Sequence, residues 1–399
     1  MSDFQPTQRR IKRHVIAKTH TFFAVTPPGT ESICANEIQS LSIDTPQIKE
    51  LPGGVEFKGR LTSCYVANLY LRTANRVLMR LTEFKATNFR QLETKASKVP
   101  WELYLAPDVE HIFNIKCIRS RLVHTDAIAE HLENAIQGQL PSNASDRQIK
   151  TGQCSRQRIY VRIVDDRVVI SLDSSGPLLF KRGLKLDVGP APIRETLAAA
   201  ILKLAGYDGS QILIDPMCGS GSFSLEAAML ARNIPAGAYR QFAFMNWPAF
   251  REAHWRHLRK TATSRIRPVL APVVFASDID EKRVEALRKI ANQSDISEIM
   301  HVTRRDFFNF NPQKITKKPG LVVLNPPYGV RLQPAKNPKQ FYAEIRQKLF
   351  SDYRDWRVAL LAKEQTVSRL FPKTLQRIAI NHGGIDLLLI IGVIKPNRT

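Results

Sequence analysis

The sequence has few cysteines, and none of them is spaced like a metal ligand. Five cysteines occur in 399 residues without a C-x-x-C pair, so the spacing predicts neither a zinc site nor a disulfide framework. The nine histidines form no H-E-x-x-H or H-x-E group. We therefore expect no metal, and we expect thiols that stay reduced, as they do in the cytoplasm.

The chain also lacks a long apolar run. Its longest, Ile385 to Ile394, is far shorter than the roughly 18 residues that a membrane span needs, and its Leu and β-branched content is typical of a buried strand. The basic N-terminus is not followed by the apolar segment of a secretory signal. These absences predict a cytoplasmic protein with no membrane partner.

Acidic residues are in deficit. There are 36 Asp and Glu against 59 Lys and Arg, which gives a net charge of +23. Each phosphate that a Lys or Arg neutralises releases a condensed counterion, so a large, clustered positive excess favours a nucleic acid partner. The basic residues form three clusters: Arg9, Arg10, Lys12, Arg13 and Lys18; Arg251, Arg256, Arg259, Lys260, Arg265 and Arg267; and Arg304, Arg305, Lys314, Lys317 and Lys318.

The first half of the chain reads as an α+β module. Strand-like segments at 20–25, 112–117, 158–164 and 167–172 alternate with helical ones, and Asp165-Asp166 forms a short hairpin turn. Between Thr62 and Glu83 the apolar residues recur near helical spacing. We expect one long helix there, with Arg72, Arg76 and Arg80 offering phosphate contacts on its basic face.

The pattern changes after a segment rich in glycine and proline at 183–192. Strands of nearly continuous apolar character then alternate with helices, which predicts a doubly wound, mostly parallel sheet. The last two strands flank Gly383-Gly384 and read as a hairpin that adds one antiparallel strand. An insertion at about 234–272, rich in arginine and containing Trp247 and Trp255, interrupts the alternation.

The first chemical motif is ILIDPMCGSGSFSLEAAML at 212–230. Asp215 ends a strand, and Gly219 and Gly221 open a helix where a ligand can approach the backbone. Ser224 stands where a dinucleotide fingerprint has its third glycine, and the chain has no phosphate-binding P-loop. An acidic residue at this turn suits a ligand that carries an ammonium group.

The second motif, FASDID at 275–280, ends the next strand in Asp278. Such a carboxylate can bind two ribose hydroxyls while an adjacent apolar residue flanks an adenine. The alternative is a helix cap, a common role for Asp.

The third motif is LVVLNPPYG at 321–329. Two prolines after a buried strand hold the backbone rigid, so the Asn325 side chain and the Pro326 carbonyl present two acceptors. They match the two hydrogens of an exocyclic amine, on whose ring Tyr328 can stack. A purely structural proline turn is the alternative.

Together these motifs resemble class I S-adenosylmethionine-dependent methyltransferases that carry NPPY, and over its length the chain is similar to the THUMP-domain RNA methyltransferases, especially those of guanine N2 in large-subunit ribosomal RNA. The resemblance implies S-adenosylmethionine as cofactor, RNA as partner and a Rossmann-like C-terminal domain with a seven-stranded sheet. It implies cofactor contacts from Asp215, Gly219, Gly221, Asp278 and Asp306, and base contacts from Asn325, Pro326 and Tyr328. The domains would be a basic arm (1–19), an α+β module (20–172) with a THUMP domain at about 45–165, a linker (173–189) and a methyltransferase domain (190–399).

Two other functions stay open. Adenine N6 is an exocyclic amine that satisfies the same acceptors, so methylation of adenine in RNA or DNA is one alternative. A non-catalytic RNA-binding or ribosome-assembly protein is the other, although intact acidic strand ends argue against loss of activity. The sequence does not indicate an oligomeric state.

Overall fold

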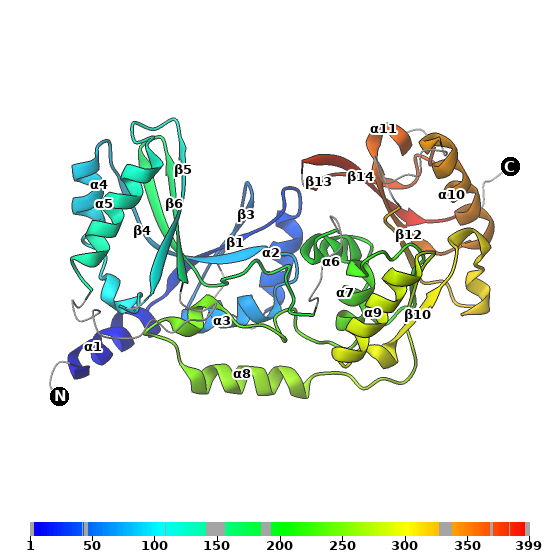
Figure 1. The fold of residues 1–399 in the computed structure, drawn as a ribbon, viewed down its shortest axis with the longest axis horizontal. Helices are drawn as coiled ribbons and strands as arrows, with labels where there is room; N and C mark the ends of the chain where they lie inside the picture. Colours follow the sequence, from blue (N-terminus) through cyan, green and yellow to red (C-terminus); the bar gives the residue numbers. More distant parts are fainter. Residues whose placement is uncertain are drawn as a thin grey trace. The chain divides into compact units, whose positions relative to one another are not determined.

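The computed structural model describes residues 4–395 apart from 42, 44–46, 108, 141–155, 185–192, 327–336, 368–369 and 383 (Figure 1). Two compact units form, and each includes segments from distant parts of the sequence. The first contains Met1–Thr26, Cys34–Leu179 and Arg240–Lys260, and the second contains Pro27–Ile33, Phe180–Tyr239 and Thr261–Thr399. Each unit is described separately below.

The first unit is built on a seven-stranded sheet in the order β2-β3-β1-β4-β7-β6-β5. All neighbouring strands are antiparallel except β5 and β6, which run parallel. Its strands are β1 His20–Val25, β2 Ile48–Leu51, β3 Gly54–Gly59, β4 Arg76–Lys85, β5 Glu110–Ile118, β6 Arg156–Val164 and β7 Arg167–Asp173. Its helices include α1 Phe4–Ile11, α2 Glu31–Ser40, α3 Leu61–Tyr70, α4 Phe89–Ala96 and α5 Thr125–Gln137.

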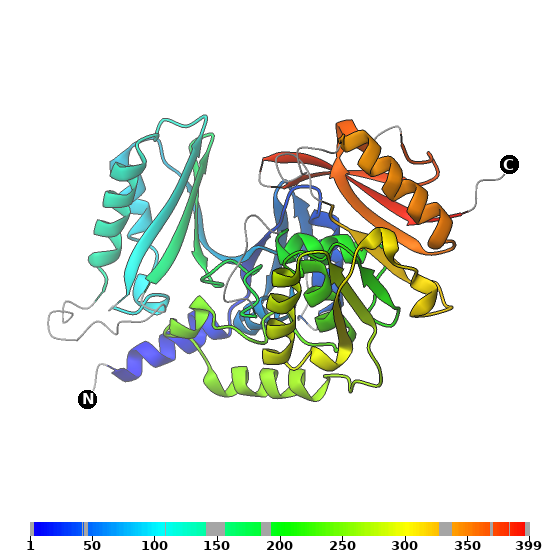
Figure 2. The same ribbon diagram turned by 45° about the vertical axis from the view of Figure 1, so that its right-hand side comes forward.

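Helices α4 and α5 lie side by side against one face of this sheet, as both ribbon views show (Figures 1 and 2). Strand β6 alternates between buried and more exposed residues, which is the period-2 pattern of a sheet covered on one side. The turn between β6 and β7 places Asp165 and Asp166 at positive φ, as a two-residue hairpin requires. The expected α+β architecture is confirmed.

The long helix expected at 62–83 is wrong. Helix α3 ends at Tyr70 and β4 begins at Arg76. The buried carboxylate of Glu37 accepts hydrogen bonds from the backbone N–H of Thr73 at 3.0 Å and from that of Arg72 at 3.3 Å, which satisfies the donors of the connecting loop without helical partners. Tertiary contacts therefore override a spacing that also fits a strand.

The basic face expected on that helix does not exist either. Arg76 is buried and paired with Asp173, and Arg72 is also buried. Arg80 is half-buried and pairs with Glu56 at 3.0 Å. These guanidinium groups hold the module together and are not free to neutralise phosphates.

The insertion contributes an aromatic cluster to the first unit. Phe244 stacks on Tyr65 of α3 with ring centroids 4.5 Å apart, and Phe242 and Trp255 extend the cluster. The indole N–H of Trp247 donates to Oε1 of Gln157 at 2.8 Å. Residues 240–260 therefore belong with the N-terminal elements although they interrupt the C-terminal sequence.

The second unit is built on a seven-stranded sheet in the order β10-β9-β8-β11-β12-β14-β13. Strands β10 through β12 pair in parallel, and β14 pairs antiparallel with both β12 and β13, which confirms the mostly parallel sheet and the terminal hairpin. The strands are β8 Leu213–Asp215, β9 Val274–Asp278, β10 Met300–Arg304, β11 Leu321–Leu324, β12 Arg357–Lys363, β13 Gln376–His382 and β14 Ile385–Val393.

Helices cover this sheet on both faces. They are α6 Glu195–Leu204, α7 Ser222–Ala231, α9 Glu281–Gln293, α10 Pro338–Asp352 and the short α11 Glu364–Val367, while α8 Glu252–Ser264 lies in the insertion. Leu321 and Val323 of β11 pack in the apolar core with α6, α7 and α9. Val322 and Leu324 pack in a second core with α10. A strand buried on both faces has to be apolar throughout, which explains the run LVVL.

Candidate functional site

Four adjacent parallel strands end at the same edge of the second sheet with the predicted polar residues. Asp215 is the last residue of β8 and Asp278 the last of β9. Asp306 lies two residues beyond β10, and Asn325 directly follows β11. The chain passes from β8 to β9 and β10 on one side and then to β11 and β12 on the other, so β8 and β11 flank a topological switch point. Ligands of open α/β sheets bind at this position.

Asp278 organises the loop after β8. Its carboxylate accepts hydrogen bonds from the backbone N–H of Gly219 at 2.9 Å and from that of Asp280 at 3.0 Å. The N–H of Cys218 donates to the carbonyl of Ser277 at 2.9 Å, so the ends of β8 and β9 are joined twice. Each carboxylate oxygen can accept a further hydrogen bond, and Asp278 can still receive ribose hydroxyls. The cap role weighed for this residue belongs to Asp280, which caps α9.

Asp215 connects β8 to the helix that follows. Its side chain is 1% exposed, and Oδ2 accepts a hydrogen bond of 2.6 Å from the hydroxyl of Ser224. The departure from the dinucleotide fingerprint at residue 224 therefore has a local function, which sequence reasoning missed. A glycine there could not hold the carboxylate.

The two glycines of the loop differ in what surrounds them. Both have positive φ, +51° at Gly219 and +78° at Gly221, a conformation that glycine adopts without steric cost. A Cβ on Gly219 would meet only a guanidinium nitrogen of Arg283, 3.7 Å away, whereas a Cβ on Gly221 would stand 2.4 Å from Leu287 of α9. Open space at Gly219 leaves room for a ligand against the backbone, and Gly221 allows α7 and α9 to pack closely.

Residues after β9 and β10 add an apolar surface and a second carboxylate. Ile279 is 63% exposed although it is a large hydrophobic residue, so it can cover one face of an adenine. Asp306 is half-buried, and its Oδ1 accepts from the N–H of Phe308 at 3.0 Å. Strand β10, which precedes Asp306, was missed in the sequence because its residues, MHVTR, do not form an apolar run.

Asn325 is the polar residue of the NPPY segment that the structure describes most informatively. Its Oδ1 is buried and accepts no hydrogen bond from any described residue. A buried acceptor without a donor is costly in a folded protein, so its presence indicates an external donor. Pro326 is buried beside it. Tyr328 lies outside the described residues.

Cys218 is not activated as a nucleophile. Burial raises the pKa of its thiol well above the usual value, and the nearby carboxylates of Asp215 and Asp278 raise it further. The reactive form of cysteine is the thiolate, so this thiol is inert at neutral pH. The described residues contain no group of His, Cys, Asp and Glu able to hold a metal ion and no helix long and apolar enough to cross a membrane.

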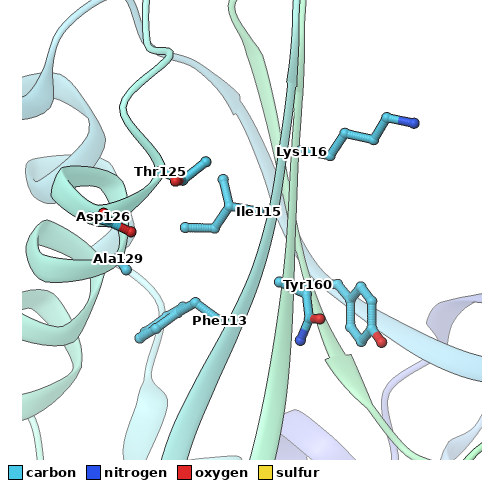
Figure 3. Close-up of a pocket in the computed structure, with 8 residues that line it drawn as sticks. Phe113, Ile115, Lys116, Thr125, Asp126, Ala129 and Tyr160 are labelled. Carbon is cyan, nitrogen blue, oxygen red and sulfur yellow. The ribbon is translucent and has the colours of Figure 1, made fainter.

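A separate hollow of about 520 Å³ lies in the first unit between β5 and α5. Phe113 and Ile115 point from β5 toward α5, while Lys116 and Tyr160 lie on the other side of the strands (Figure 3). The hollow contains none of the residues from the three sequence motifs.

The C-terminal half matches a family model. Residues 182–390 match the RMKL-like methyltransferase domain, and residues 21–78 match the RlmL ferredoxin-like domain. The chain belongs to the RMKL-like methyltransferase domain family. In this family member, the matched region contains all four polar strand ends described above.

Curated relatives of this RMKL-like chain include enzymes of different length. It is 34% identical over 390 residues to the ribosomal RNA large subunit methyltransferase K/L of Methylococcus capsulatus, covering 95% of this chain and 52% of that protein. The chain thus spans about half the length of that relative. It is 31% identical over 376 residues to slr0064 of Synechocystis, named as a candidate RNA methyltransferase, covering 94% of this chain and 97% of that protein.

Solved structures share the whole architecture. SMU.472, titled as a candidate methyltransferase complexed with SAH, aligns with a TM-score of 0.82 at 28% identity, covering 96% of this RMKL-like chain and 99% of that chain. A Listeria monocytogenes protein titled as a predicted N6-adenine-specific DNA methylase has the same TM-score and identity, and 98% of each chain is covered.

Proposed function

We propose that the protein is an S-adenosylmethionine-dependent RNA methyltransferase that modifies the exocyclic N2 of a guanine in large-subunit ribosomal RNA. The observation that carries the proposal is the row of Asp215, Asp278, Asp306 and Asn325 at adjacent strand ends of the switch point. The curated relative of Methylococcus capsulatus, whose name specifies ribosomal RNA of the large subunit, supports the substrate class.

The residues at the sheet edge fit the cofactor. Asp278 would accept the ribose hydroxyls, Ile279 would cover the adenine, and Asp306 would receive its amino group. The loop at Gly219 and Gly221 would line the methionine end, where the buried charge of Asp215 favours an ammonium group. The solved relative SMU.472, whose title names SAH, supports this assignment. When bound, S-adenosylmethionine supplies a methyl group on a sulfonium, which is a good electrophile.

The NPPY segment would position the base. The side-chain oxygen of Asn325 and the carbonyl of Pro326 would accept the two amine hydrogens, direct the nitrogen lone pair at the methyl carbon and later release one proton to solvent. Tyr328 would stack on the base, which helps to compensate for removing it from its neighbours. Positioning and aligned acceptors would supply most of the rate.

The test is transfer of a labelled methyl group from S-adenosylmethionine to protein-free large-subunit ribosomal RNA, followed by mass spectrometry of the nucleosides. We expect N2-methylguanosine, and calorimetry should detect cofactor binding. N6-methyladenosine would instead support the adenine alternative, for which DNA is the parallel substrate because of the Listeria relative's title. RNA binding without methyl transfer to any base would support the non-catalytic alternative.

A further inference from the structure

Helix α8 carries an exposed concentration of positive charge. Its first ten residues and the residue before it expose nearly every basic side chain: Arg251, His254, Arg256, His257, Arg259 and Lys260. Glu252 is the helix's single acidic residue, and it lies 3.3 Å from Nε of Arg256. This pair is exposed and contributes little, so the helix presents a strong positive surface.

The opposite face of α8 fixes the helix in place. Trp255 is 6% exposed, and its ring makes edge contacts with Phe244 and Phe242 at centroid distances of 5.5 and 5.7 Å. The backbone N–H of Arg251 donates to the hydroxyl of Tyr65 at 3.1 Å. At 100° per residue, Arg256, Arg259 and Lys260 share a face that points away from Trp255.

The cations of α8 are available, unlike those of the sheet beside it. Arg76 and Arg80 of β4 are already paired with carboxylates. Among the residues that the structure describes, Arg259 and Lys260 belong to no ion pair and donate no side-chain hydrogen bond. Their charge is therefore uncompensated by the protein.

We propose that the basic face of α8 binds the phosphate backbone of the RNA substrate, an inference that rests on the proposed function. Rigid presentation of several cations is what a polyanion requires, since each neutralised phosphate releases a counterion. A membrane-surface helix would expose Trp, Phe or Leu beside its basic residues. The large aromatic residue of α8 is instead buried in the protein, so the charge complements a nucleic acid.

The experiment compares two triple variants of the full chain that lose the same charge. One is R256Q/R259Q/K260Q on α8. The matched control is K289Q/R354Q/K373Q, three exposed basic residues of the second unit. The probe is protein-free large-subunit ribosomal RNA, with binding measured between 50 and 300 mM salt, and calorimetric affinity for S-adenosylmethionine verifies that each variant folds.

Loss of about three phosphate contacts should reduce the slope of log affinity against log salt by about 2 to 3, and affinity at 0.1 M salt should fall about 100-fold. R256K/R259K should retain most of the affinity because its charges remain. The control should stay within a few-fold of the parent. Equal losses in both triples, an unchanged slope in the α8 triple, or equally strong α8-dependent binding to phosphatidylserine vesicles would overturn the inference.

The outcome is separable from that of the proposed function. If the parent protein transfers methyl groups to RNA and the α8 triple binds and reacts like it, only the inference about α8 fails. If α8-dependent RNA binding is found but no base is methylated, the proposed activity fails and the binding surface stands.

Discussion

Asn325 offers the most discriminating test of the chemistry, because its replacement should affect activity and stability in opposite directions. Its Oδ1 is buried without a donor among the described residues, so the folded protein has already lost the hydration of this oxygen. A base amine would supply the missing hydrogen bond. Asn325→Ala removes an acceptor that helps in the reaction but is unfavourable in the free protein.

The two effects can be given magnitudes. Removing one preorganised polar group from an active site typically costs about 10²–10³ in rate. Leaving a buried polar atom unpaired costs about 1–3 kcal/mol, part of which the alanine recovers, offset by the small cavity it creates. We therefore expect a 10²–10³-fold slower transfer with the free energy of unfolding unchanged or raised by about 1 kcal/mol.

The assay is single-turnover transfer of labelled methyl to RNA, with cofactor affinity and urea unfolding measured on the same preparations. Asn325→Asp keeps an acceptor oxygen at the same place and should lose less activity than Asn325→Ala. Tyr328→Phe, which keeps the ring for stacking, should likewise be milder than Tyr328→Ala. Parental transfer by Asn325→Ala, or a loss explained entirely by unfolding, would refute the role given to this acceptor.

Three further outcomes are expected. Gly221→Ala should destabilise the protein by about 2–3 kcal/mol in urea unfolding, because the left-handed backbone and the contact with Leu287 both oppose a Cβ; Gly53→Ala, at φ +83° with nothing within 4 Å, should show only the smaller backbone cost. Asp278→Ala should weaken S-adenosylmethionine binding at least about tenfold by calorimetry, since it removes an acceptor and releases the glycine loop, and undiminished affinity would contradict the assignment. Cys218→Ala should keep methyl transfer near the parental rate, because burial raises the pKa of the thiol and keeps it protonated, and an inactive but folded variant would contradict that.

The second sheet could be predicted from the sequence because each local signal agrees with the tertiary structure. Apolar runs such as LVVL at 321–324 are buried on both faces, and the hairpin at Gly384 forms as expected. Strand β10 escaped notice because its exposed edge position tolerates His301 and Arg304. An edge strand is covered less completely than a central one, so its sequence carries a weaker apolar signal.

The segment from Thr62 to Glu83 shows where periodicity is insufficient. Its spacing fits a helix over the first ten residues, and α3 does form there. Farther along, Val77 and Met79 are buried in β4, and Arg76 is satisfied by Asp173, a residue almost a hundred positions away. Burial raises the pKa of the Asp173 carboxyl to about 6 even beside this arginine. A window of sequence contains no information about such a partner.

The same distinction separates the candidate site from the RNA surface. Parallel strands bring their carboxyl ends to one edge whatever the side chains are, so Asp215, Asp278 and Asn325 could be grouped from topology alone. The assignment of the insertion to the first unit depends instead on how Trp255 packs against Tyr65, two residues 190 positions apart. The packing of that one aromatic residue turns Arg256 and Lys260 outward, and it makes α8, not the arginines of β4, the place where we expect RNA to bind.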